Sequence, residues 1–226
     1  MTYRPSALVL IIANMIPLIG VAFFEWRVID ILLLYWTESV IIGVINVLRM
    51  SRCQTNNLLG GLLPAIAGKE IPAELKANLP KISLPGIKFF IIPFFILHYG
   101  GFCFGHLMAV IGLFGETGLR NGLGASLQYF WQPEYWLAVA AIAASHMYSY
   151  FSNYIGRNEF QHTSLFLLMQ RPYGRIVAMH IAIVFGAGLV MWLGSALPML
   201  VVLILAKTAM DLRLHEGERA KFAMQA

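Results

Sequence analysis

The chain is dominated by long apolar stretches that are almost free of charged residues. A helix needs about 20 apolar residues to cross the hydrocarbon layer of a membrane, because each residue adds only about 1.5 Å of length. Lipid offers no hydrogen-bond partner to backbone N–H and C=O groups, so such stretches are expected to form helices. We therefore predict an all-α polytopic integral membrane protein, a six-transmembrane-helix bundle in a single domain over residues 1–226. The predicted spans are residues 7–24, 28–48, 89–114, 136–155, 176–193 and 196–210, of which the last is interrupted by Pro198 and Lys207.

The composition supports this fold class and excludes several others. Hydrophobic residues make up 59% of the chain and charged residues 12%, whereas charged residues are roughly 25% of a soluble globular domain. A chain with so little ionised surface is neither a soluble domain nor intrinsically disordered. The two cysteines, Cys53 and Cys103, lack the spacing of a zinc finger and are too few for a disulfide scaffold.

The basic residues predict the direction of the chain. Of the 16 Lys and Arg residues, all but Arg27 and Arg120 fall on one side of the predicted spans. The positive-inside rule therefore places both termini and the connection 51–85 in the cytoplasm, and the connection 116–133 outside. The net charge of +5 then reflects attraction to anionic lipid headgroups rather than to nucleic acid. The apolar segment 58–68 is too short to span and is expected to lie in the membrane interface, with a re-entrant path as the alternative.

Five ionisable side chains lie in the central part of the predicted spans, away from their ends. Such a group costs on the order of 3 kcal/mol at the bilayer centre, so each one needs a partner or a function. Glu38 and His146 both lie about 15 Å from the outer ends of their spans, and the others fall in the same broad central layer. We expect all five to converge on one buried centre: Glu38, His98, His106, His146 and His180. Polar neighbours on the same helices are expected to support it: Tyr35, Ser149, Asn153 and Tyr173.

One carboxylate and several imidazoles suit a transition-metal ion such as zinc. The expected ligands are Glu38, His98, His146 and His180, with His106 as a substitute. If the ion activates water, Glu38 is also the expected catalytic residue, and the protein is a membrane-embedded metal-dependent hydrolase. No His-Glu-x-x-His or Gly-x-Ser-Gly motif is present in the spans.

Three other interpretations of the same residues stay open. Glu and His side chains can pass protons, so the centre also suits a proton- or ion-coupled transporter or channel. One or two of the histidines would suit haem. The histidines could instead only lock the helices together through hydrogen bonds. The substrate, the identity of the metal and assembly into a homo-oligomer are open as well.

A second group of charges is predicted at the cytoplasmic end of the last span. Lys207, Asp211 and His215 are each four residues apart, which places them on one helix face, and Arg175 is expected within reach of Asp211. We expect a structural or lipid-facing cluster at the headgroups. The alternative is a cytoplasmic gate, or a carboxylate or phosphate site built on Arg175 and Lys207.

Several short motifs resemble those of a family of bacterial multi-pass membrane proteins of unknown function. They are Tyr35-Trp36-Thr37-Glu38, His98-Tyr99-Gly100, Asn153-Tyr154, Pro172-Tyr173-Gly174-Arg175 leading to His180, and Lys207, Asp211 and His215. The resemblance runs over nearly the whole chain and implies a location in the bacterial inner membrane. It implies no activity, so the chemistry has to be argued from the site.

Overall fold

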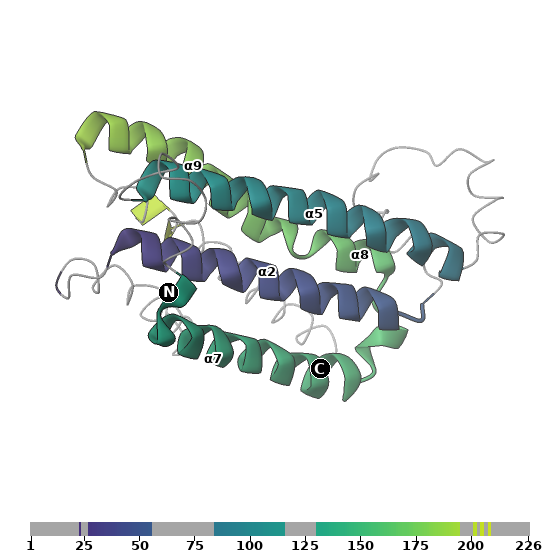
Figure 1. Cartoon of the computed structure of the whole chain (residues 1–226). Coiled ribbons are helices and arrows are strands. Elements are labelled where there is room, and N and C mark those ends of the chain that lie inside the picture. Colours follow the sequence, from purple (N-terminus) through teal and green to yellow (C-terminus); the bar gives the residue numbers. More distant parts are fainter. Residues whose placement is uncertain are drawn as a thin grey trace, which may run out of the picture. The chain divides into compact units, whose positions relative to one another are not determined.

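The computed structural model describes residues 23, 27–55, 84–115, 130–194, 201, 202, 204, 205 and 208. Every regular element in this part of the chain is a helix, which confirms the predicted all-helical class (Figure 1). Nearly all of the predicted spans 7–24 and 196–210, and the whole segment 58–68, lie outside the described residues.

The predicted span 28–48 corresponds to helix α2, which runs over Val28–Arg52. Its first turn carries Asp30, whose carboxylate accepts two hydrogen bonds from Arg27 at 2.7 and 2.8 Å. Its last turn carries Arg49 and Arg52. Acidic residues at the start of a helix and basic residues at its end favour the helix dipole, and this explains why α2 continues past the apolar stretch.

Helix α5 runs over Leu84–Phe114 and begins five residues before the predicted span 89–114. Pro85 lies in its first turn, where the missing N–H of proline has no intrahelical acceptor to lose. Pro93 lies inside the helix without ending it. A proline inside an apolar helix removes one backbone hydrogen bond, while the other backbone hydrogen bonds of the helix continue on both sides of it.

The predicted span 136–155 is not one regular helix. Helix α7 runs over Pro133–Ser149, and the chain then continues as a π-helix, η3, over Tyr150–Ile155. The wider π turn buries both Tyr150 and Tyr154, whose rings stack with centroids 5.8 Å apart. Packing of these two rings is a tertiary effect that apolar periodicity does not reveal.

Two further helices follow a short 3-10 turn, η4, at Glu159–Gln161. Helix α8, Leu165–Gln170, is capped by Ser164, whose side chain accepts a hydrogen bond from the N–H of Leu167. Helix α9 covers Tyr173–Leu193 and contains the predicted span 176–193. It ends at Gly194, whose φ of +67° is the left-handed conformation that glycine adopts without strain.

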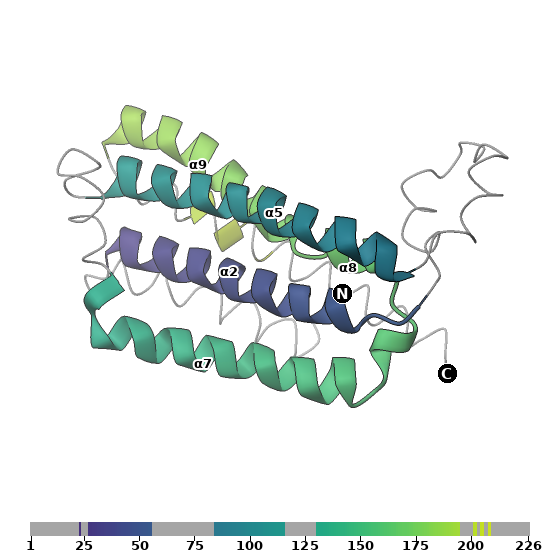
Figure 2. The same cartoon turned by 45° about the vertical axis from the view of Figure 1, so that its right-hand side comes forward.

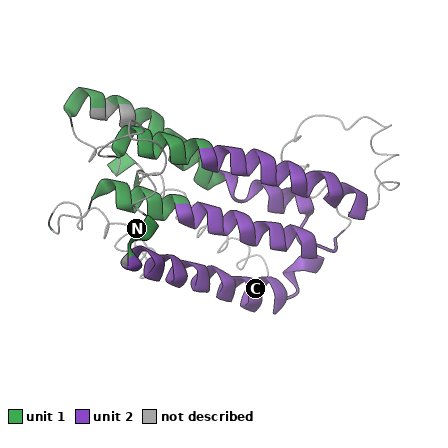
Figure 3. Ribbon diagram, in the orientation of Figure 1, with its two compact units in different colours: residues 1–36, 105–132, 174–226 green, residues 37–104, 133–173 purple. Residues whose placement is uncertain are grey.

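The chain divides into two compact units (Figure 3). Unit 1 comprises residues 1–36, 105–132 and 174–226, and unit 2 comprises residues 37–104 and 133–173. The described core of unit 1 includes Leu32, Leu33, Val110, Ile111, Met179 and Ala182. That of unit 2 includes Met50, Phe95, Tyr99, Tyr154, Leu165 and Leu168.

In unit 2, the second half of α2 lies between α5 and α7, as the two views in Figures 1 and 2 agree. α2 and α5 are tightly packed at Gly43, where an added Cβ atom would lie 2.6 Å from Cε1 of Tyr99. The hydroxyl of Tyr99 donates a hydrogen bond to the carbonyl of Ser39 at 2.8 Å. Glycine is therefore required here because the ring packs directly on the α2 backbone.

Replacing Gly43 with Ala is expected to lower the free energy of unfolding by about 1–3 kcal/mol, because the new methyl group overpacks a filled contact. Gly100→Ala is the matched control, since a Cβ at Gly100 meets nothing within 4 Å. Denaturant titration of both variants measures the difference. Equal stability of the two variants would contradict the packing at Gly43.

Candidate functional site

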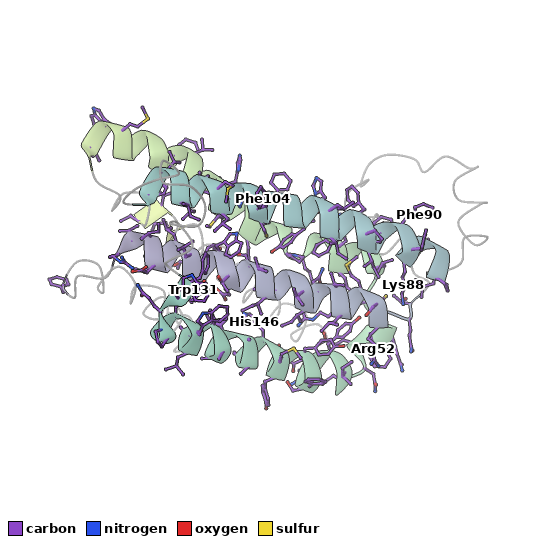
Figure 4. The ribbon with its side chains drawn as sticks, in the orientation of Figure 1. Arg52, Lys88, Phe90, Phe104, Trp131 and His146 are labelled. Atoms are coloured by element: carbon purple, nitrogen blue, oxygen red, sulfur yellow. The ribbon has the colours of Figure 1, made fainter. Side chains whose placement is uncertain are left out.

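The central contact of unit 2 joins a carboxylate on α2 to an imidazole on α7. Nε2 of His146 lies 3.3 Å from Oε1 of Glu38, and Figure 4 shows His146 between the ribbons of the two helices. The side chains are 32% and 17% exposed, so the pair is only partly accessible. The predicted meeting of these two residues is therefore present in the structure.

A second pair lies next to it. The hydroxyl groups of Thr37 and Tyr135 share a hydrogen bond, so consecutive residues of α2 contact α7. Tyr135 and His146 lie about three turns apart on α7, and they contact the consecutive residues Thr37 and Glu38 of α2. Two polar contacts thus fix α7 against α2 around Glu38.

The polar residues expected to support His146 make other contacts. Nδ2 of Asn153 donates a hydrogen bond to Oγ of Ser149 at 3.3 Å, and both residues lie within the same α7–η3 segment. Tyr35 belongs to unit 1, where its ring lies 4.6 Å from the guanidinium carbon of Arg175. The imidazole of His146 is therefore oriented by Glu38 rather than by these three side chains.

The other three histidines form two further contacts. In unit 1, Nε2 of His106 lies 3.3 Å from Nδ1 of His180, and the two rings are tilted by 40°. In unit 2, Nδ1 of His98 lies 2.8 Å from the hydroxyl of Tyr173, and its ring stacks on Phe94. Tyr173 was expected to support the predicted centre, and its hydroxyl group is hydrogen-bonded to His98.

The proposed ligands are thus distributed over two pairs, Glu38 with His146 and His106 with His180, and the single histidine His98. Glu38, His98 and His146 belong to unit 2, and His106 and His180 belong to unit 1. Within the described ranges, no group of three His, Cys, Asp or Glu side chains is placed to hold a metal ion. Each pair by itself offers two ligand atoms.

The predicted cytoplasmic charge cluster is described only at Arg175, which is 9% exposed and packs on Tyr35. Lys207, Asp211 and His215 lie outside the described residues. The two cysteines are free thiols. Sγ of Cys53 contacts the carbonyl of Thr163 at 3.3 Å, and burial raises the pKa of this thiol because a thiolate would be poorly solvated there.

The sequence interpretation missed a second polar region in unit 2, where α2 ends. Arg49 was considered only as a positive-inside charge, and Tyr154 only as part of a short motif. In the structure the hydroxyl of Tyr154 donates to the carbonyl of Arg49 at 2.8 Å. The sequence signal for this contact was an arginine at the end of one apolar stretch and a tyrosine in another.

The family model that matches the chain covers residues 1–226 and is described as a family of unknown function, DUF6498. The chain belongs to this family. The resemblance seen in the motifs is thereby confirmed at the level of a family of unknown function. No curated protein and no solved structure matches the chain. DUF6498 carries no assigned activity, so the function rests on the site geometry.

Proposed function

We propose that the protein is a multi-pass protein of the bacterial inner membrane. Two described helices, α2 and α5, are long and apolar enough to cross a membrane. In α5 only 17% of the most apolar window is buried, so this helix presents its apolar surface outward. Large exposed side chains on it include Phe89, Phe90, Leu97 and Phe104 (Figure 4). An apolar surface of this extent favours contact with lipid.

Within that membrane protein, the Glu38–His146 pair serves as a proton-exchanging centre of an ion-coupled transporter. The observation that carries this proposal is the 3.3 Å contact between a carboxylate and an imidazole on two neighbouring apolar helices. An intramembrane ionisable pair is costly and is typical of a proton pathway. The pair can hold a proton on either partner, and losing that proton changes the charge of the site by one unit.

The proposal is tested by proton flux through the full chain reconstituted in liposomes that contain a pH-sensitive dye. A pH gradient is imposed, and the wild type is expected to dissipate it faster than Glu38→Gln, which keeps the shape of the side chain but cannot ionise. His162→Gln is the matched control, because His162 is an exposed histidine in the connection between η4 and α8. Equal rates for Glu38→Gln and wild type, or for wild type and empty liposomes, would overturn the proposal.

A second candidate function is binding of a zinc-like ion, from which a metal-dependent hydrolase would follow. Two ligands on tetrahedral zinc are about 3.3 Å apart when their bonds are about 2.0 Å long. The Glu38–His146 and His106–His180 contacts both have this separation. A bound ion would supply a Lewis acid that lowers the pKa of water, while Glu38 and His146 would provide two of its ligands.

Metal analysis of the purified full chain separates this candidate from proton exchange. Stoichiometric zinc that is lost in His146→Ala would support it at the Glu38–His146 pair, and zinc that is lost in His180→Ala would support a site at the His106–His180 pair. Haem is favoured less, since two histidines on opposite sides of a haem iron have their ligating nitrogens about 4 Å apart. The nitrogens of His106 and His180 are in direct contact at 3.3 Å. A Soret band in the purified protein would reverse this order.

A further inference from the structure

The end of α2 carries an arginine, Arg49, with an unsatisfied hydrogen-bond donor. Nε of Arg49 is buried and has no hydrogen-bond partner among the described residues. Its guanidinium carbon lies 5.7 Å from the centre of the Tyr154 ring, close to the outer limit of about 6 Å for a cation–π contact. A buried donor without an acceptor is costly, and the hydrogen-bonding capacity of this guanidinium group is not fully satisfied by the described residues.

The position of Arg49 is held firmly. The carbonyl of Arg49 accepts a hydrogen bond from Tyr154, which is fully buried and stacks on Tyr150. Three residues before Arg49, the side chain of Asn46 donates a hydrogen bond to the carbonyl of Leu168 at 2.8 Å and so ties α2 to α8. The last turns of α2 are therefore linked to both η3 and α8.

The charges around this arginine are unbalanced. Arg171, which directly follows α8, repels Arg49, and Glu159 is the carboxylate that attracts it. No carboxylate in the described part of unit 2 lies within ion-pair distance of Arg49. The described Lys and Arg residues of unit 2 all lie where α2, η3 and α8 end or where α5 begins: Arg49, Arg52, Lys88, Arg157 and Arg171. Figure 4 labels Arg52 and Lys88.

We propose that Arg49 and Arg171 bind a phosphate group, carried either by an anionic lipid headgroup or by a free phosphate ion. Arginine matches phosphate oxygens through its planar fork of N–H donors. A bound phosphate would accept hydrogen bonds from the terminal N–H groups of the two arginines and would neutralise the repulsion between their guanidinium groups. Lys88 is not needed, because its ammonium group already donates to the carbonyl of Ser51 at 2.8 Å.

This site is separate from the proton-exchanging pair. Glu38 and Arg49 are 11 positions apart on α2, which corresponds to about 16 Å along the helix axis. The phosphate site therefore stands or fails on binding measurements alone, whatever the outcome of the flux experiment.

The test measures the thermal unfolding midpoint of the delipidated full chain in detergent, in three titrations at equal ionic strength. The probes are phosphatidylglycerol, phosphatidylcholine and inorganic phosphate. Phosphatidylglycerol is expected to raise the midpoint of the wild type more than phosphatidylcholine does. A lipid-headgroup site responds to phosphatidylglycerol but not to inorganic phosphate, whereas a site for the free ion responds to inorganic phosphate alone.

The variants show whether the two arginines form the site. Arg49→Gln and Arg171→Gln are each expected to raise the half-saturating concentration about tenfold, the order expected for one charge-assisted hydrogen bond. Arg49→Lys should lose part of the affinity, since it keeps the charge but not the fork. Arg52→Gln is the matched control, because Arg52 is exposed and carries the same charge.

Two results would overturn the proposal. One is unchanged half-saturation in Arg171→Gln, which tests the site even where Arg49→Gln fails to fold, since Arg171 is exposed. The other is an equal loss in Arg52→Gln, which would show a diffuse basic surface in place of a defined site.

Discussion

Replacing Tyr154 with Ala is expected to lower the free energy of unfolding by about 3–5 kcal/mol, the range for removing a large buried aromatic ring. Tyr154 is 0% exposed, stacks on Tyr150 and lies edge-on to Phe160. Its hydroxyl also holds the carbonyl of Arg49 at the end of α2. The substitution therefore removes packing and a hydrogen bond from the contact that joins η3 to α2.

Equilibrium unfolding in mixed detergent micelles measures this loss, with two comparisons. Tyr154→Phe removes only the hydroxyl and should cost about 0.5–1.5 kcal/mol. Tyr148→Ala removes a ring that is 75% exposed and should change stability by about 0.5 kcal/mol or less. If Tyr154→Ala were no less stable than Tyr148→Ala, the packing of η3 on α2 would be wrong.

The second large effect concerns the Glu38–His146 pair. If both residues act as one proton-exchanging unit, Glu38→Gln and His146→Gln should each abolish most of the proton flux. The double variant should then lose little more than either single variant, because residues in direct contact couple by about 0.5–3 kcal/mol. The 3.3 Å contact is the physical reason for this expectation.

Flux through all four proteins of this double-mutant cycle measures the coupling. Each variant should first show the wild-type unfolding midpoint, so that lost flux is not lost fold. Multiplicative losses would indicate two independent roles, and they would contradict a shared proton. Retained flux in the double variant would rule out the pair as the transport centre.

The positions of the helices were predicted more accurately from the apolar stretches than the residues at which the helices begin and end. The predicted spans 28–48, 89–114 and 176–193 all lie inside described helices, and each of those helices is a few residues longer. The extensions arise from charged and proline-containing segments that continue a helix without being apolar. The π-helix at Tyr150–Ile155 could not be predicted, since it depends on rings that pack against other segments.

For the candidate site, the sequence predicted the position of each residue along its helix but not the direction in which its side chain points. Counting residues placed Glu38 and His146 at a similar depth, and the structure brings them into contact. Tyr173 was predicted only as a supporting side chain on the helix that carries His180, and its hydrogen bond goes to His98. Each residue turns about 100° around a helix axis, so small differences in helix rotation change which side chains meet.

The amino-acid sequence by itself determined that this protein is helical, because long apolar stretches can satisfy their backbone polar groups only within a helix when no water is present. It also determined which ionisable groups lie within those stretches. Only the tertiary structure decided that the groups meet in pairs, Glu38 with His146 and His106 with His180. The reason is that the pairing depends on how each helix rotates against its neighbours, and that rotation is set by side-chain packing such as the ring of Tyr99 on Gly43.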